Sequence, residues 1–161
     1  MLLEERIGEL LRQRGLTLGT VESATGGLIA QRITSVAGSS DYFKGAIVSY
    51  ANETKIKVVG VKKTTLEEFG AVSPQVAEQM ATGGRAVLRV DICITDTGIA
   101  GPGGATKGKP VGLFYLGFAD RDGYTSRRHE FHGTREENRR QAAEAALQWL
   151  LDYLQHGTAA H

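Results

Sequence analysis

Several features are scarce in this sequence, and each shortage excludes a class of protein. Cys93 is the only cysteine, so the chain has no internal disulfide and no multi-cysteine zinc site. The 19 basic and 18 acidic residues leave a formal net charge of +1, which gives neither the basic field of a nucleic-acid binder nor an acidic tail. No apolar run approaches the roughly 18 residues that a membrane span needs.

The remaining composition predicts one globular domain in the cytoplasm. Hydrophobic residues make up 41% and charged residues 23% of the 161 residues, as in ordinary domains. We expect a single domain over residues 1–155 and a frayed tail over 156–161. Glu4 and Glu5 stand where a signal peptide would be basic. Cys93 lies in an apolar run that is typical of a buried thiol in a reducing compartment.

Glycine, in contrast, is abundant. The chain has 21 glycines, close to twice the usual share of about 7%. With only three prolines beside them, this is not the composition of a linker. The glycines cluster at 26–27, 83–84 and 98–108, which indicates tight turns or backbone that comes close to a ligand.

Hydrophobic periodicity predicts helices that alternate with strands. Helices are expected over about 2–14, 25–37, 53–58, 74–88 and 135–155. Asn52 and Thr134 are expected helix caps, and Pro74 is an expected first helical residue. The helix that begins at Pro74 has an apolar stripe of Val76, Met80, Val87 and Leu88.

Strands are expected over about 17–21, 46–50, 91–95, 111–119 and 125–131. The last two follow each other across 120–123 and form a hairpin, which makes the sheet mixed. The sequence therefore predicts an α/β fold, a three-layer α/β/α sandwich with a mixed, mostly parallel sheet.

The first candidate site is the segment 21–27, where a strand ends and a helix begins. Such a junction places a side chain at the end of the sheet beside unpaired helix N–H groups. Ser23 is a candidate nucleophile there, and the amides of Gly26 and Gly27 are candidates to hold a developing oxyanion. The alternative is that Ser23 or Thr25 only caps the helix. The spacing is not that of the G-x-S-x-G hydrolase motif.

Lys55 is the second candidate. If Asn52 caps the helix, Lys55 stands in its first turn, where the helix dipole disfavours an ammonium group. Partial burial would act in the same direction and lower the pKa of the lysine. A neutral lysine amine can take a proton from a serine. The alternative is an ordinary surface lysine.

Two further segments have features of anion-binding sites. The glycine-rich run 95–104, which includes Thr97, Gly98 and Gly101, follows a strand and can offer N–H groups to a phosphate or carboxylate. It has neither the dinucleotide-binding nor the P-loop spacing, and a flexible turn is the alternative. Arg135 begins the last helix, where the dipole disfavours a cation. A bound anion would resolve that conflict, and a solvated arginine is the alternative.

The sequence contains little that indicates a metal-binding site. His129 and His132 are three residues apart on an expected strand and so point to opposite faces. There is no His-Glu-x-x-His motif and no carboxylate cluster. Trp149 and the leucines near it favour a core position or a dimer contact over a cofactor site.

Six segments, taken in order, resemble the CinA C-terminal domain family, the nicotinamide-nucleotide amidases. They are VESATGG (21–27), AGSS (37–40), YANETK (50–55), GAVS (70–73), TGIAGP (97–102) and KPVG (109–112), and together they extend over most of the chain. The family often has cysteine where Ala24 stands, a position that is not thought to be the nucleophile. Longer members carry an additional N-terminal domain that this sequence does not include.

The resemblance implies hydrolysis of nicotinamide mononucleotide, a small-molecule substrate, to nicotinic acid mononucleotide and ammonia, with no metal or organic cofactor. Matched residue by residue, the family's nucleophile falls on Ser23, its lysine base on Lys55 and its assisting tyrosine on Tyr50. Its hydroxyl before the glycine-rich loop falls on Thr97. The amides of that loop, at Gly98, are the alternative to those of Gly26 and Gly27 for holding the oxyanion. Its phosphate-binding arginine falls on Arg135, with Arg128 as an alternative.

A noncatalytic nucleotide-binding or protein-interaction domain is the alternative function, because family members are named for competence and DNA damage. The joint presence of Ser23, Tyr50 and Lys55 argues against it, since a binding module needs no nucleophile. We also expect a homo-oligomer, a dimer or higher, and no nucleic-acid or membrane partner.

Overall fold

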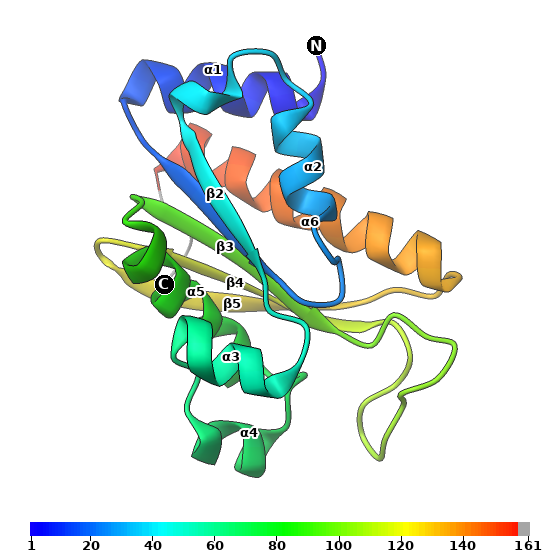
Figure 1. Ribbon diagram of the computed structural model, residues 1–161. Helices are drawn as coiled ribbons and strands as arrows, with labels where there is room; N and C mark the ends of the chain where they lie inside the picture. Colours follow the sequence, from blue (N-terminus) through cyan, green and yellow to red (C-terminus); the bar gives the residue numbers. More distant parts are fainter. Residues whose placement is uncertain (158–161) are drawn as a thin grey trace.

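A five-stranded mixed sheet forms the middle layer of the structure, a computed structural model that describes residues 1–157 (Figure 1). Its strands are β1 (Leu18–Glu22), β2 (Phe43–Val48), β3 (Ile92–Gly98), β4 (Leu113–Asp120) and β5 (Gly123–Glu130). Their order is β2-β1-β3-β4-β5. β1 is parallel to β2 and β3, whereas β4 is antiparallel to β3 and β5. The predicted α/β class and the mixed sheet are confirmed.

Helices cover both faces of this sheet (Figure 1). One face carries α1 (Leu3–Arg14), α2 (Leu28–Thr34) and α6 (Arg135–His156), and the other carries α3 (Asn52–Val59), α4 (Lys63–Phe69) and α5 (Pro74–Leu88). A short 3-10 turn, η1 (Ser39–Asp41), leads into β2. Helix α6 extends one residue into the tail that was expected to fray, and residues 158–161 of that tail lie outside the described residues.

The predicted starts of the two longest helices are confirmed. Ser73 caps α5, where its hydroxyl accepts from the Val76 N–H at 3.3 Å, and Pro74 follows at the first helical position. Thr134 caps α6 and forms a capping box with Glu137. The predicted hairpin between β4 and β5 is also present, with Asp120 opposite Gly123.

Three local predictions are wrong. Asn52 is the first residue of α3, and Ala51, with no side-chain cap, precedes it. Helix α2 begins at Leu28 instead of Thr25. Val87 is 53% exposed, because Leu88 and not Val87 covers the glycines of β1 and β2. Helix α4 was not predicted, since its seven residues bury only Thr65 and form no apolar stripe.

The two faces of the sheet have separate cores. The core beneath α1, α2 and α6 contains Ile94, Phe118 and Trp149, whose ring centroid lies 5.3 Å from that of Phe118. Trp149 is therefore a core residue. The core against α5 contains Met80 and Cys93. Burial raises the pKa of Cys93 to about 12, so the expected buried thiol is protonated.

Helix α5 also positions the helix that carries Lys55. Gly83 of α5 faces α3, where an added Cβ atom would lie 1.7 Å from the carbonyl oxygen of Val59. Only glycine permits the two backbones to approach so closely. Val59 and Met80 then pack in one cluster. Lys55, one turn before Val59, is thereby held at a fixed place beside the sheet.

Candidate active site

Most of the predicted site residues meet at the carboxyl ends of the parallel strands. Ser23 follows β1, Tyr50 lies two residues after β2, and Thr97 lies at the end of β3. Since β2 and β3 flank β1 on opposite sides, this is a topological switch point, the usual ligand site of such sheets. The cavity there has a volume of about 300 Å³. Its lining includes Ser23, Tyr50, Lys55, Thr97, Gly98, Gly101 and Arg135.

Lys55 reaches Ser23 from the first turn of α3. Its Nζ donates to Ser23 Oγ at 3.1 Å and to the carbonyl oxygen of Tyr50 at 2.9 Å. The lysine is only 1% exposed, and neither hydrogen-bond partner is a carboxylate. Burial therefore lowers the pKa of Lys55, against a smaller opposing effect of the Asp96 charge. A serine hydroxyl against a buried lysine amine can act as a nucleophile with its general base.

A buried carboxylate fixes the start of α2 after the Ser23 turn. Glu22 accepts hydrogen bonds from the N–H groups of Gly27, Ile29 and Ala30 at 2.9–3.1 Å. It supplies acceptors that the first turn of a helix otherwise lacks. Gly27 directly precedes the helix and has φ 104°, a conformation that residues with a Cβ atom rarely adopt.

Asp96 of β3 holds the other side of the same turn. Its Oδ1 accepts from the Ser23 N–H at 3.0 Å, and its Oδ2 accepts from the Thr25 N–H at 3.1 Å. The Thr25 hydroxyl lies 2.5 Å from Asp96 Oδ1 and 2.7 Å from Glu22 Oε1. Burial, aided by the Glu22 charge and opposed by the hydrogen bonds, raises the pKa of Asp96 to about 6.

The amides of Gly26 and Gly27 do not belong to the cavity. The Gly26 N–H donates to the carbonyl oxygen of Ser23 at 3.0 Å, and the Gly27 N–H is taken by Glu22. Neither residue lines the cavity. This corrects the expectation that the two amides hold an oxyanion. Ala24 does line the cavity, and its N–H has no acceptor within residues 1–157.

Tyr50 and Arg135 form the mouth of the cavity. Arg135 donates to the carbonyl oxygen of Gly101 at 2.9 Å and to the Tyr50 hydroxyl at 3.3 Å. Tyr50 is 62% exposed, and its main-chain carbonyl, not its hydroxyl, binds Lys55. Arg128 pairs with Glu130 at 3.6 Å and does not line the cavity. Of the two arginines considered from the sequence, Arg135 is therefore the one at the site.

The sequence reasoning missed Glu22, Asp96 and Arg139. Arg139 of α6 donates to the carbonyl oxygens of Ala24 and Thr25 at 2.9 and 3.0 Å and so braces the Ser23 turn. For Glu22 and Asp96, the sequence did contain a signal. Each is a lone carboxylate in a buried strand, in the sequences LGTVE of β1 and ICITDTG of β3. A buried carboxylate needs partners.

Thr97 joins a further segment to the cavity wall. Its hydroxyl donates to the carbonyl oxygen of Ala71 at 2.8 Å, and Ala71 and Val72 also line the cavity.

Within residues 1–157, no group of three or more His, Cys, Asp and Glu side chains has an arrangement that suits a metal ion. The helices in that same range include none with the length and hydropathy of a membrane span.

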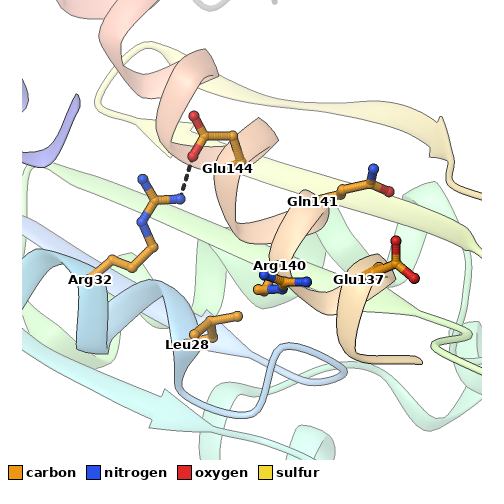
Figure 2. Close-up of a pocket in the computed structure, with 6 residues that line it drawn as sticks. All are labelled: Leu28, Arg32, Glu137, Arg140, Gln141 and Glu144. Atoms are coloured by element: carbon orange, nitrogen blue, oxygen red, sulfur yellow. Dashed lines mark hydrogen bonds and ion pairs between the residues drawn. The ribbon is translucent and has the colours of Figure 1, made fainter. Parts of the chain in front are cut away.

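A larger cavity, of about 480 Å³, lies between α2 and α6 and shares no lining residue with the first (Figure 2). Its lining consists of Leu28, Arg32, Glu137, Arg140, Gln141 and Glu144. Figure 2 shows Arg32 reaching Glu144, a contact of 2.5 Å, and Arg32 also pairs with Glu4 at 2.8 Å. This lining offers no hydroxyl, thiol or amine nucleophile, whereas the lining of the smaller cavity includes Ser23 and Lys55.

The fold and the site define an α/β protein with a buried serine–lysine pair at the carboxyl ends of its parallel strands. The chain belongs to the CinA C-terminal domain family, whose model matches residues 2–154. The resemblance noted from the six sequence segments is thereby confirmed.

Relatives and solved structures agree with this assignment. CinA-like proteins of Geobacter sulfurreducens and Salinibacter ruber are 49% and 48% identical over 92% and 91% of this chain. The chain spans only 36% and 35% of their lengths. A competence/damage inducible protein from Agrobacterium tumefaciens has a TM-score of 0.91 at 40% identity, over 96% of this chain and 94% of that one. Competence damage-inducible protein A from Klebsiella pneumoniae has a TM-score of 0.93 at 31% identity, over 97% of each chain.

Proposed function

We propose that this protein is an amidase that hydrolyses the carboxamide of nicotinamide mononucleotide to nicotinic acid mononucleotide and ammonia. The observation that carries the proposal is the buried Lys55 Nζ at 3.1 Å from Ser23 Oγ in a cavity at the carboxyl ends of the parallel strands. The choice of substrate rests on the family resemblance.

The pair supplies the proton transfers that amide hydrolysis requires. Neutral Lys55 takes the Ser23 proton as Oγ attacks the carboxamide carbon, and the resulting lysine ammonium gives a proton to the departing ammonia. Water, deprotonated by Lys55, then attacks the carbonyl carbon of the acyl-serine ester. The bond from that carbon to Ser23 Oγ breaks, the lysine ammonium returns its proton to Oγ, and the acid product leaves as its carboxylate after losing its own proton to solvent. The Ala24 N–H, next to the nucleophile and without an acceptor in the described chain, is the proposed donor to the oxyanion.

The mouth of the cavity suits an anionic group such as the 5′-phosphate. Arg135 binds only a carbonyl and a phenol oxygen there, and no carboxylate within residues 1–157 pairs with it. Its charge is thus available to a phosphate, which guanidinium groups bind strongly. The exposed ring of Tyr50 beside it can flank the nucleotide, while its carbonyl assists by holding Lys55.

The test is ammonia release from nicotinamide mononucleotide by purified protein in the presence of a chelator. Ser23→Ala is expected to lose activity by several orders of magnitude, as when a nucleophile is removed. Ser49→Ala is the matched control, because Ser49 is also buried and follows β2, yet its hydroxyl has no hydrogen-bond partner in the structure. Both variants are expected to bind the nucleotide in calorimetry.

The outcomes separate the two functions considered. Binding of the nucleotide by the wild-type protein without ammonia release would favour the noncatalytic domain. More than a tenth of wild-type turnover in Ser23→Ala would exclude Ser23 as the nucleophile. The homo-oligomer and the cytoplasmic location stay predictions, which sedimentation and cell fractionation would test.

A further inference from the structure

The least expected feature of the site is a pair of buried carboxylates behind the nucleophile. Asp96 is completely buried, and its two oxygens accept from the N–H groups of Ser23 and Thr25. Two backbone donors on one rigid carboxylate fix the path of the chain between them. Because Ser23 lies in this path, its Oγ is directed toward Lys55 Nζ.

We propose that Asp96 is a positioning residue, which holds the backbone of Ser23 and Thr25 so that Ser23 Oγ faces Lys55 Nζ, and which places a negative charge behind that pair. The inference rests on the proposed Ser23–Lys55 chemistry and adds a residue that the family resemblance did not assign. Asp96 does not line the cavity, so it acts through Ser23 and Lys55 and not on the substrate.

The other charged groups around the turn have different partners. Glu22 faces the N–H groups at the start of α2, and Arg139 of α6 binds the carbonyl oxygens of Ala24 and Thr25. Arg135 lies at the mouth of the cavity, where it donates to the carbonyl oxygen of Gly101. Among residues 1–157, Asp96 is the charged group that raises the pKa of Lys55 against the effect of burial.

Asp96→Asn tests both parts of the proposal, because it keeps the shape of the side chain and removes its charge. In either orientation, the amide presents an NH₂ group to one of the two backbone donors, which then loses its acceptor. Asp91→Asn is the matched control. Asp91 lies at the opposite end of β3 and likewise accepts from a backbone N–H and a hydroxyl, both of Thr17, at 2.8 and 3.0 Å.

Three measurements apply to each variant. The first is an NMR titration of the Lys55 side chain with labelled lysine, assigned by the signal that is missing in Lys55→Met. The second is the pH profile of ammonia release, with kcat and KM determined separately. The third is thermal unfolding, which reports how much folded protein each assay contains.

For Asp96→Asn we expect the Lys55 titration midpoint and the rising limb of the pH profile to move together to lower pH. Above that limb, kcat should fall about ten- to hundredfold, as for a lost hydrogen bond to a charged group, with KM little changed. Asp91→Asn should leave the midpoint and kcat at wild-type values. A folded Asp96→Asn protein with an unchanged midpoint, or with wild-type kcat, would overturn the proposal.

A second variant decides the question if Asp96→Asn does not fold. Asp96→Glu keeps the charge but displaces the carboxylate by one methylene group, so the midpoint should stay near the wild-type value while kcat falls. Wild-type kcat in Asp96→Glu would refute the positioning role. The Lys55 titration does not depend on amidase activity. If the wild-type protein released no ammonia, the titration would still decide whether Asp96 controls this lysine.

Discussion

Replacing Lys55 with arginine tests whether this residue acts as a base or only as a positive charge. Both side chains can carry a positive charge, but a guanidinium group stays protonated at every pH at which the protein is folded, whereas a lysine amine can become neutral. Lys55 Nζ is the nitrogen that contacts Ser23 Oγ, the proposed nucleophile, at 3.1 Å. If it accepts the Ser23 proton, Lys55→Arg should lose about 10²- to 10⁴-fold in kcat, the usual contribution of a general base.

The rate of ammonia release should increase with pH. Only the neutral amine accepts a proton, so the rate should rise as the pH increases through the pKa of Lys55. Burial lowers that pKa from its ordinary value of 10.5, so the rise should lie below the titration range of a free lysine. Lys55→Met should be as inactive as Lys55→Arg.

The assay is initial-rate ammonia release from pH 5 to 10, with thermal unfolding as the check on folding. Lys57→Arg is the matched control, because Lys57 lies in the same helix but is exposed. It should behave as the wild type. Turnover by Lys55→Arg above a tenth of the wild-type rate, with the same pH profile, would refute the base assignment and leave Lys55 with a structural role.

Two further substitutions test the mouth of the cavity. Arg135→Ala should weaken binding of nicotinamide mononucleotide by about 1.5–3 kcal/mol, as for one charge-assisted hydrogen bond, and calorimetry measures this directly. Nicotinamide riboside, which lacks the phosphate, should bind equally to both proteins, and an equal loss for both ligands would contradict the phosphate role. Tyr50→Phe keeps the carbonyl that binds Lys55 and loses only a long, exposed hydrogen bond from Arg135 at 3.3 Å, so kcat/KM should fall by about tenfold at most. A loss of 10²-fold or more in steady-state kinetics would instead show that the hydroxyl takes part in proton transfer.

The sequence was sufficient to predict structural elements that are determined by residues close to one another in the chain. Ser73 followed by Pro74, and Thr134 three residues before Glu137, are helix-start patterns that act within one turn, and the structure has helices there. The strand-to-helix junction at Ser23 was also readable, because apolar strand residues give way to small and glycine residues within a few positions.

The errors lie where side-chain contacts that extend beyond one helical turn decide the structure. Helix α2 starts late because the carboxylate of Glu22 folds back onto Gly27 and Ile29, and the same contact removes the Gly27 amide from the list of oxyanion donors. Asp96 is 73 positions from Ser23 and binds backbone groups, which every residue has. No pattern of residue types identifies such a partner, whereas the burial of a lone carboxylate in an apolar strand does indicate that one exists.

The placement of charge explains how one small site can hold two carboxylates and a basic lysine. Direct contact with Asp96 or Glu22 would stabilise the ammonium form of Lys55 and raise its pKa. In the structure the carboxylates instead bind N–H and hydroxyl groups of the Ser23 turn, and Lys55 binds a hydroxyl and a carbonyl oxygen. The acids therefore hold the turn through its backbone, and the turn presents the Ser23 hydroxyl to Lys55. This separation lets burial lower the pKa of Lys55 while the nucleophile stays rigidly placed.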